Sequence, residues 1–162
     1  LETKGPILIL QPRVGRGGRI FDIVKLRSMV ADAERDGKAE WARVEDPRIT
    51  PVGRWIRRLR LDELPQFINV LMGQMSLVGP RPERPEMHDQ IVKVHPDFAI
   101  RVAVKPGVTG LAQIYNGYAD SVDSSQRKLA YDRRYIANIS FGFDLSLLFR
   151  TVKVVLTGHG SR

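Results

Sequence analysis

The sequence contains no cysteine. This absence excludes disulfide bridges, cysteine-ligated zinc, iron–sulfur clusters and thiol nucleophiles, and it is consistent with a reducing compartment. No apolar run approaches the roughly 18 residues of a membrane span, and no signal peptide opens the chain. We therefore expect a chain that is soluble as given and that can still lie on a membrane surface.

Aromatic residues are also scarce, at 7% of the chain, and they are not interleaved with basic residues. This argues against a stacking platform, so nucleic acid is not an expected partner. The segment from Gly15 to Gly18 is not a phosphate-binding P-loop, because no Gly-Lys-Ser/Thr follows it. It is not a dinucleotide-binding motif either, because Ile20 stands where that motif needs glycine. A hairpin turn is therefore the better interpretation. The histidines show no metal-ligand spacing: they are His88, His95 and His159.

Acidic residues are outnumbered by basic ones. The chain has 18 Asp and Glu against 26 Lys and Arg, a net charge of +8 at pH 7. Most of the basic residues are Arg, whose planar guanidinium pairs bidentately with phosphate or carboxylate. From charge alone, the partners to consider are nucleotides, nucleic acid and an anionic membrane surface.

The length of 162 residues fits one domain, residues 1–162, without an internal repeat or a linker. Residues 6–12 and 19–27 are β-rich and flank the glycine turn, which predicts a hairpin. Helices are predicted over 28–40, 85–94, 122–138 and 144–156, the third capped by Asp120 or Ser121. Residues 76–86, with four Gly or Pro among eleven, and the turn-rich residues 105–110 are expected to be irregular.

Two further amphipathic helices are predicted between residues 50 and 73. Thr50 is the expected N-cap of the first, with Pro51 at its first position, and Gly73 ends the second. Both have apolar residues at helical spacing, namely Val52, Trp55, Ile56 and Leu59, then Leu64, Phe67, Ile68 and Leu71. The expected fold is a small, helix-rich α/β (α+β) domain with a short N-terminal β-hairpin and interfacial amphipathic helices.

Two adjacent carboxylates, Asp62 and Glu63, stand between these two helices. In one interpretation Asp62 is an N-cap and Glu63 complements the dipole of the following helix. In the other, one carboxylate attacks phosphorus and the other holds a divalent cation, while nearby arginines neutralise phosphate. The pattern alone favours the capping interpretation.

Arg81, between Pro80 and Pro82, is a second candidate. Prolines on either side of an arginine can simply shape an exposed loop, and the pattern alone favours that interpretation. They also restrict the backbone around Arg81, which lowers the entropic cost of binding an anion.

Longer motifs resemble those of the bacterial sugar transferases, the monotopic phosphoglycosyl transferases or polyprenyl-phosphate hexose-1-phosphate transferases. The motifs are Lys25-Leu-Arg-Ser-Met29 with Asp32-Ala-Glu34, Leu61-Asp-Glu-Leu-Pro-Gln66, Asn69-Val-Leu71, Met75-Ser-Leu-Val-Gly-Pro-Arg-Pro-Glu83 and Val104-Lys-Pro-Gly-Val-Thr-Gly110. Tyr131-Asp132, Tyr135-Ile136 and the segment from Asp144 to Gly158 are similar too. The resemblance covers nearly the whole chain, and its ordered motifs are more specific than any single spacing.

The resemblance implies an enzyme, a phosphotransferase that starts exopolysaccharide or other glycoconjugate assembly. Such enzymes move a sugar-1-phosphate from a UDP-sugar donor to a polyprenyl phosphate acceptor and release UMP. They act at the cytoplasmic face of the bacterial inner membrane, need Mg²⁺ and pass through a covalent phospho-sugar enzyme. The sugar, the acceptor and the polysaccharide pathway are not specified by these motifs.

The resemblance also assigns roles to residues of this chain. Asp62 would be the nucleophile, and Asp62 and Glu63 together the Mg²⁺ ligands, with the separate role of Glu63 left open. The implied substrate-binding residues are Lys25, Arg27, Arg57, Pro80, Arg81 and Pro82. Arg81 would bind the nucleotide part, Arg57 would be a phosphate ligand, and Lys25 and Arg27 would form a basic strand end near the site.

Members of this family usually begin with an apolar, membrane-entering helical segment before a Gly-Pro such as Gly5-Pro6. The resemblance therefore implies a catalytic domain trimmed of that segment, or a membrane-free relative. Arg60 also differs, because many relatives carry a small polar residue there. Two alternatives stay open, a non-catalytic basic module that binds anionic lipid or nucleic acid and an inactive scaffold, and the pattern leaves a homodimer open as well.

Overall fold

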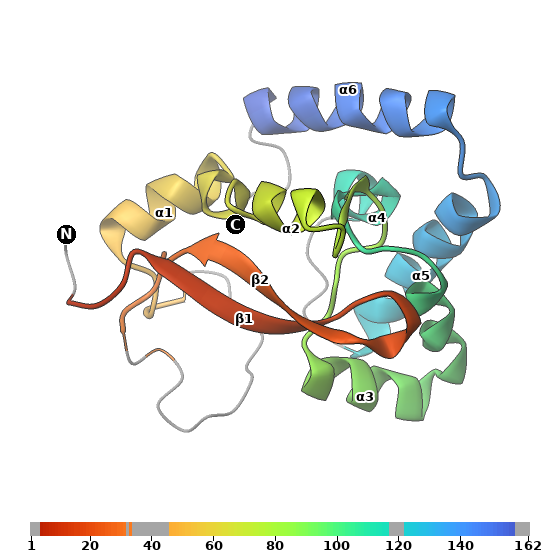
Figure 1. Cartoon of the computed structure of the whole chain (residues 1–162), viewed down its shortest axis with the longest axis horizontal. Coiled ribbons are helices and arrows are strands. Elements are labelled where there is room, and N and C mark those ends of the chain that lie inside the picture. Colours follow the sequence, from red (N-terminus) through yellow and green to blue (C-terminus); the bar gives the residue numbers. More distant parts are fainter. Residues whose placement is uncertain (1–3, 32, 34–45, 117–121, 158–162) are drawn as a thin grey trace.

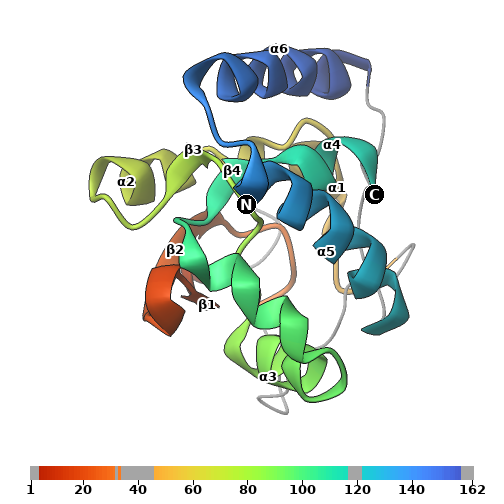
Figure 2. The same ribbon diagram turned by 90° about the vertical axis from the view of Figure 1, so that its right-hand side faces the viewer.

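The computed structural model of the chain describes residues 4–31, 33, 46–116 and 122–157 (Figure 1). Its helices and short strands form a small mixed domain, as predicted, and the hairpin crosses its middle. Helix α6 (Phe141–Thr157) and helix α3 (Pro85–Val94) lie on opposite sides of the domain, with α4 (Leu111–Tyr115) between them in both views (Figures 1 and 2).

The N-terminal hairpin consists of β1 (Leu8–Val14) and β2 (Ile20–Leu26), which pair antiparallel. The turn between them, η1 (Arg16–Gly18), has Gly17 and Gly18 at φ 68° and 77°, the left-handed region that glycine adopts most easily. The predicted hairpin is thus confirmed, although β1 begins two residues later than expected. Ile9 lies opposite Lys25 and Arg13 opposite Phe21, so these side chains share one face of the hairpin.

A second, parallel pair of strands joins β3 (Ser76–Val78) to β4 (Gly107–Thr109). Both strands lie in segments expected to be irregular, so that prediction was wrong. The backbones approach so closely that a Cβ on Gly107 would lie 2.1 Å from the Gly79 nitrogen. The glycines that suggested a loop are thus what allows the two strand ends to meet.

Three short helical segments follow one another: α1 (Pro51–Arg58), η2 (Leu61–Glu63) and α2 (Gln66–Leu71). The predicted cap is confirmed, because the Gly53 N–H donates to Thr50 Oγ1 at 2.9 Å and Pro51 occupies the first helical position. Helix α2 ends where Gly73 was expected to stop it, with Gly73 at φ 75°. Asn69 fixes α2 to β2, since it donates to the Asp22 carbonyl at 2.8 Å and accepts from the Val24 N–H at 3.0 Å.

The helix predicted over residues 28–40 is absent from its described part, residues 28–31 and 33. Met29 instead forms a β-bridge with Ile49, and the Ser28 carbonyl accepts from the Thr50 N–H at 3.1 Å. These bonds use the backbone groups that a helix would need, which explains the wrong prediction. Residue 32 and residues 34–40 lie outside the described part.

The C-terminal half is helical. The predicted helices are confirmed as α3, α5 (Val122–Ala137) and α6, although α6 begins three residues earlier than expected. The proposed caps Asp120 and Ser121 lie outside the described residues. The 3-10 segment η3 (Pro96–Ala103) and the short α4 were not predicted.

Two buried clusters hold these elements together. One contains Val78, Leu111, Tyr135 and Leu147 and joins β3, α4, α5 and α6. The other contains Ile91, Phe98 and Leu129 and joins α3, η3 and α5. The first cluster therefore packs the C-terminal helices on β3, and the second joins α3 and η3 to α5.

The segments α1, η2 and α2 carry a row of exposed apolar side chains, here called the apolar row. Its members, each more than a third exposed, are Val52, Trp55, Leu59, Leu61, Leu64, Phe67, Ile68, Leu71 and Met72. Single exposed apolar residues are ordinary, but nine of them along three consecutive segments are unusual for a surface that faces only water. Among the described residues, no helix is both long and apolar enough to cross a membrane.

Candidate active site

Asp62 and Glu63 lie on the 3-10 turn η2, between α1 and α2. Arg60, just before the turn, has φ 55°, the only positive φ of a non-glycine residue in the described chain. Helix α2 starts after Pro65 and has no side-chain cap, so the interpretation of Asp62 as its N-cap was wrong. Left-handed backbone at a bulky residue is uncommon and is enriched at functional sites.

Glu63 is buried and paired with cations. Both of its carboxylate oxygens accept from the Arg81 guanidinium, with Nη1 to Oε2 at 3.2 Å, and Lys25 Nζ lies 4.0 Å from Oε1. Burial alone would raise the pKa of Glu63, but the charges of Arg81 and Lys25 lower it to about 2. Glu63 therefore stays ionised and is held in one orientation by a bidentate pair.

Asp62 has the opposite character. Burial and the neighbouring Glu63 charge raise its pKa, and Lys25, Arg57 and Arg81 act against that rise. Within the described part of the chain, no hydrogen bond or ion pair holds its carboxylate. Asp62 is therefore a partly exposed carboxylate that is close to cations and available to a ligand.

Lys25 reaches the dyad from the inner face of β2. Burial lowers the pKa of Lys25 to about 7, and the charge of Glu63 partly opposes this shift. The position of Lys25 relative to the dyad depends on Asn69, because the bonds of Asn69 to Asp22 and Val24 join α2 to β2. The hairpin thus places the buried Lys25 side chain close to the two carboxylates.

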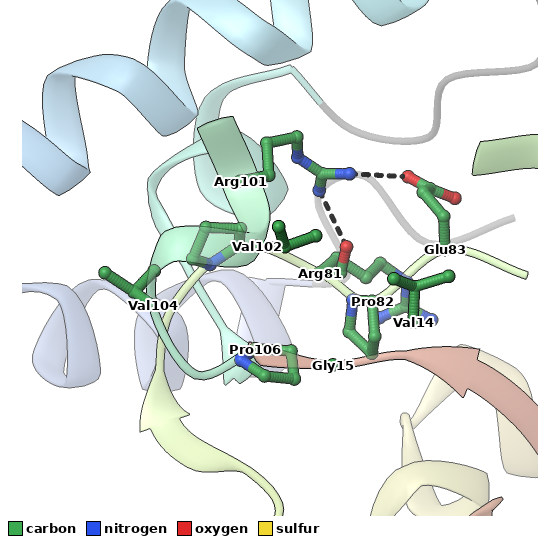
Figure 3. Close-up of a pocket in the computed structure, with 10 residues that line it drawn as sticks. Val14, Gly15, Arg81, Pro82, Glu83, Arg101, Val102, Val104 and Pro106 are labelled. Atoms are coloured by element: carbon green, nitrogen blue, oxygen red, sulfur yellow. Dashed lines mark hydrogen bonds and ion pairs between the residues drawn. The ribbon is translucent and has the colours of Figure 1, made fainter. Parts of the chain in front are cut away.

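The Pro-Arg-Pro loop is fixed at its two ends. The Pro80 carbonyl accepts from the Gly107 N–H at 3.0 Å, and the Glu83 carbonyl accepts from the Val14 N–H at 2.9 Å. Pro80 and Pro82 are buried, and Figure 3 shows the loop with Val14 and Gly15 on one side of a small pocket and Val104 and Pro106 on the other. This loop is therefore not a free surface turn, and it presents the Arg81 side chain to Glu63.

The structure thus gathers most of the predicted site. Asp62, Glu63, Lys25, Arg57 and Arg81 lie within electrostatic range of one another, although they come from four separate segments. The Arg27 guanidinium donates to the carbonyls of Lys4 at 2.7 Å and Gly5 at 3.1 Å. These bonds place Arg27 on the segment before β1, and a substrate-binding role for it remains a prediction.

Sequence analysis missed Arg13. Its side chain lies on the same hairpin face as Lys25, and burial followed by the charge of Arg81 lowers its pKa to about 10. The signal was available, because alternation along β1 and the hairpin register together put Arg13 on the inner face. It also missed a buried charged cluster behind the Pro-Arg-Pro loop, which contains Glu83, Arg101, Lys128 and Asp132.

The dyad has a donor set that suits Mg²⁺. The described residues offer no group of three metal-ligating side chains, and Mg²⁺ commonly binds through one or two carboxylates together with water and substrate phosphates. The Asp62 oxygens bind no group among the described residues, and an ionised carboxylate such as Glu63 retains lone pairs beyond a bidentate pair. Asp62 and Glu63 therefore fit a site that substrate phosphates would complete.

Comparisons with known proteins show the family of the chain. The family model described as bacterial sugar transferase matches residues 1–158. A UDP-N-acetylgalactosamine-undecaprenyl-phosphate N-acetylgalactosaminephosphotransferase of Aeromonas hydrophila is 47% identical over the whole chain, which covers 38% of that relative. A UDP-glucose:undecaprenyl-phosphate glucose-1-phosphate transferase of Escherichia coli K12 is 41% identical over 94% of the chain and 33% of its own length.

A putative undecaprenyl-phosphate N-acetylgalactosaminyl 1-phosphate transferase of Bacillus subtilis is 53% identical over 63% of the chain and 56% of its own length. The chain thus spans only about a third of the length of the Aeromonas and Escherichia relatives. The match extends over the hairpin, the dyad, the Pro-Arg-Pro loop and the C-terminal helices alike. The chain belongs to the bacterial sugar transferase family.

Proposed function

We propose that this chain transfers a sugar-1-phosphate from a UDP-sugar to a polyprenyl phosphate and releases UMP. The observation that carries the proposal is the contrast within the dyad. Asp62 is partly exposed and has no hydrogen bond or ion pair with any residue that the structure describes, whereas both oxygens of Glu63 accept from Arg81 and Glu63 lies near Lys25. The relatives named above, which include sugar-phosphate transferases acting on undecaprenyl phosphate, support the substrate classes.

In the first step, an Asp62 carboxylate oxygen attacks the phosphorus that bears the sugar. A bond forms between that oxygen and phosphorus, and the bond from phosphorus to the bridging oxygen breaks, so UMP leaves with both electrons of that bond. The product is an acyl phosphodiester that links Asp62 to the sugar. No proton needs to move, because the leaving phosphate departs as a dianion.

In the second step, a phosphate oxygen of the polyprenyl phosphate attacks the same phosphorus. The bond between phosphorus and the Asp62 oxygen breaks, which restores the carboxylate and yields a polyprenyl diphosphate sugar. Two displacements at one phosphorus give a ping-pong sequence, the kinetic fingerprint of a covalent enzyme intermediate.

The neighbouring cations make an anionic attack on an anionic phosphate feasible. Lys25, Arg57 and Arg81 surround Asp62 and would neutralise the phosphate oxygens as negative charge builds up. Mg²⁺ held by Asp62 and Glu63 would supply further charge neutralisation of the diphosphate. Glu63 also keeps the Arg81 guanidinium oriented toward the reacting phosphate.

We further propose that the apolar row lies in the headgroup layer of the cytoplasmic membrane face. The row runs along α1, η2 and α2 and thus includes Leu61 and Leu64, which flank the dyad. A membrane surface that contacts these residues would bring a lipid-anchored phosphate to Asp62. The net charge of +8 suits anionic lipids.

The test is UMP release from a panel of UDP-sugars in the presence of Mg²⁺ and polyprenyl phosphate. Wild type should turn over at least one donor, and Asp62→Asn should lower kcat by about 1,000-fold or more, because the amide is not a nucleophile. Asp89→Asn, an exposed position on α3, serves as the charge-matched control and should retain full activity. Normal turnover by Asp62→Asn would contradict the assignment of the nucleophile.

A further inference from the structure

Four charged side chains are buried directly behind the Pro-Arg-Pro loop. Glu83 is 7% exposed, Arg101 5%, Lys128 8% and Asp132 1%. They come from three separate places, namely the end of the loop, η3 and helix α5. Nothing in the reaction proposed above uses them, so their position requires another explanation.

Arg101 is the centre of this group. Its Nε donates to Asp132 Oδ2 at 2.6 Å, its Nη1 to Glu83 Oε1 at 3.3 Å, and its Nη2 to the backbone carbonyl of Arg81 at 2.6 Å. Figure 3 shows that the bonds to Glu83 and to the Arg81 carbonyl both start from the one Arg101 guanidinium. Lys128 pairs with the same Glu83 carboxylate, so two cations face two anions.

Such a cluster is a poor device for stability alone. Removing charges from water is costly, and apolar residues of similar volume often replace buried ion pairs without loss of stability. An arginine fork does offer fixed directions, because its planar donors contact several acceptors at once. The Phe98 ring, 4.5 Å from Arg101 Cζ, limits movement of the guanidinium further.

The contacts of Arg101 connect it to the active site through the loop backbone. One bond holds the carbonyl of Arg81, whose own side chain grips both oxygens of Glu63. Another holds Glu83, two residues further along the loop. A change in the direction of these two bonds would therefore move the Arg81 guanidinium relative to Glu63.

We propose that Arg101, oriented by Asp132 and Glu83, is a positioning residue that fixes the Pro-Arg-Pro loop so that Arg81 engages Glu63 and the donor phosphate. It contacts neither carboxylate of the dyad and acts only through Arg81. The kinetic part of this inference rests on the proposed sugar-phosphate transfer. The structural part, the link from Arg101 to the Arg81 side chain, does not.

A double-mutant cycle in the enzyme tests the kinetic part. Arg101→Lys keeps the charge but lacks the planar fork that contacts all three acceptors, and it should lower kcat/KM for the UDP-sugar by about 100-fold. Arg81→Lys removes the bidentate pair itself. If Arg101 acts through Arg81, the double variant should be no slower than Arg81→Lys alone, whereas effects that multiply would overturn the proposal.

Stability must be separated from positioning in this experiment. Leu147→Val weakens the other buried cluster, on α6, and provides a control whose loss of stability is measured beside that of Arg101→Lys. Its effect on kcat/KM should be small, and it should multiply with that of Arg81→Lys. If Arg101→Lys does not fold, Asp132→Asn takes its place in the cycle, since it leaves Arg101 intact and removes the negative charge that orients its Nε.

Arginine side-chain NMR provides a readout that does not depend on turnover. In wild type, the bidentate pair should slow rotation of the Arg81 guanidinium and give separate Nη signals. Arg101→Lys and Asp132→Asn should both speed up that rotation, and Leu147→Val should leave it unchanged. Unchanged Arg81 signals in both cluster variants would overturn the positioning role, whereas failure of wild type to use any UDP-sugar would overturn only the proposed function.

Discussion

At the scale of single residues, adjacent carboxylates acquire different properties from different surroundings. The Arg81 guanidinium and Lys25 lower the pKa of Glu63 to about 2, whereas burial and Glu63 itself raise that of Asp62. The two residues are adjacent in the chain, so the difference in pKa comes from their surroundings. Glu63 faces Lys25 of the hairpin and Arg81 of the loop. A division of labour between a fixed carboxylate and a reactive one follows from that asymmetry.

Lys25 gives a prediction about pH. Its pKa is lowered to about 7, so the ammonium loses its proton, and with it its charge, as the pH rises through that value. We expect kcat/KM for the anionic donor to fall about tenfold or more above pH 7, as a charge-assisted contact is lost. The pH profile of kcat/KM from pH 5 to 9 measures this.

The matched comparison is between two Lys→Arg variants. Lys25→Arg stays charged throughout this range, so the alkaline limb near pH 7 should disappear even if the rate itself is lower. Lys93→Arg, at an exposed position of α3, should reproduce the wild-type profile. An unchanged limb in Lys25→Arg would assign the titration to another group.

The dyad, Arg81 and Lys25 were singled out from the sequence by the motifs shared with the family, and the structure brings them close together. The sequence could not identify Arg101, whose three acceptors come from the loop and α5. Contacts of this kind are set by tertiary packing, and no spacing along the chain encodes them. Arg13 is intermediate, since the hairpin register alone would have put it inside.

At the scale of elements, the placement of η2 depends on how closely α1 approaches the segment before it. Gly53 in α1 packs on the Ser28 carbonyl, and a Cβ there would lie 1.9 Å from that oxygen. A backbone atom cannot yield as a flexible side chain can. We expect Gly53→Ala to lower the free energy of unfolding by about 1–3 kcal/mol, measured by denaturant titration.

Gly142→Ala is the control for this substitution, because a Cβ on Gly142 of α6 meets nothing within 4 Å. It should be neutral or stabilise the domain by up to about 1 kcal/mol, since alanine favours helix. Equal destabilisation by the two variants would show that the contact with Ser28 does not determine the result.

Elements with local signals were predicted well, and those that depend on distant pairing were not. The Thr50 cap and the apolar spacing of α1 depend only on residues that are close together in the sequence. Strands β3 and β4 have three residues each and exist only because segments about 30 residues apart pair in parallel. The glycines and prolines around these strands are typical of a loop. Only the close backbone approach at Gly79 and Gly107, which depends on the tertiary fold, explains why glycine stands there.

At the scale of the whole molecule, the position of the apolar row beside the dyad gives a prediction about membranes. Trp55 is 68% exposed and Leu71 89%, and both belong to the row. Replacing each by Ser should weaken binding to vesicles of anionic phospholipid by about tenfold or more per residue, because burial of such a side chain contributes about 1.5–3 kcal/mol. Vesicle co-sedimentation at several salt concentrations measures the affinity.

Ile20→Ser provides the comparison, since Ile20 is 56% exposed but lies on the hairpin, outside the apolar row. It should leave vesicle affinity unchanged. Added salt should weaken the electrostatic part of binding in all variants alike. If the Trp55 and Leu71 variants bind like wild type, the apolar row does not face the membrane.

The central claim is that Asp62 becomes covalently linked to a hexosyl phosphate. The most direct measurement is mass spectrometry of the chain and its peptides after incubation with the UDP-sugar and Mg²⁺ but without polyprenyl phosphate. We predict a mass increase of one hexosyl phosphate on the peptide that contains Asp62, lost when polyprenyl phosphate is added and absent from Asp62→Asn. A chain that releases UMP on adding the acceptor, yet carries its adduct on another residue or carries none under these conditions, would contradict the account.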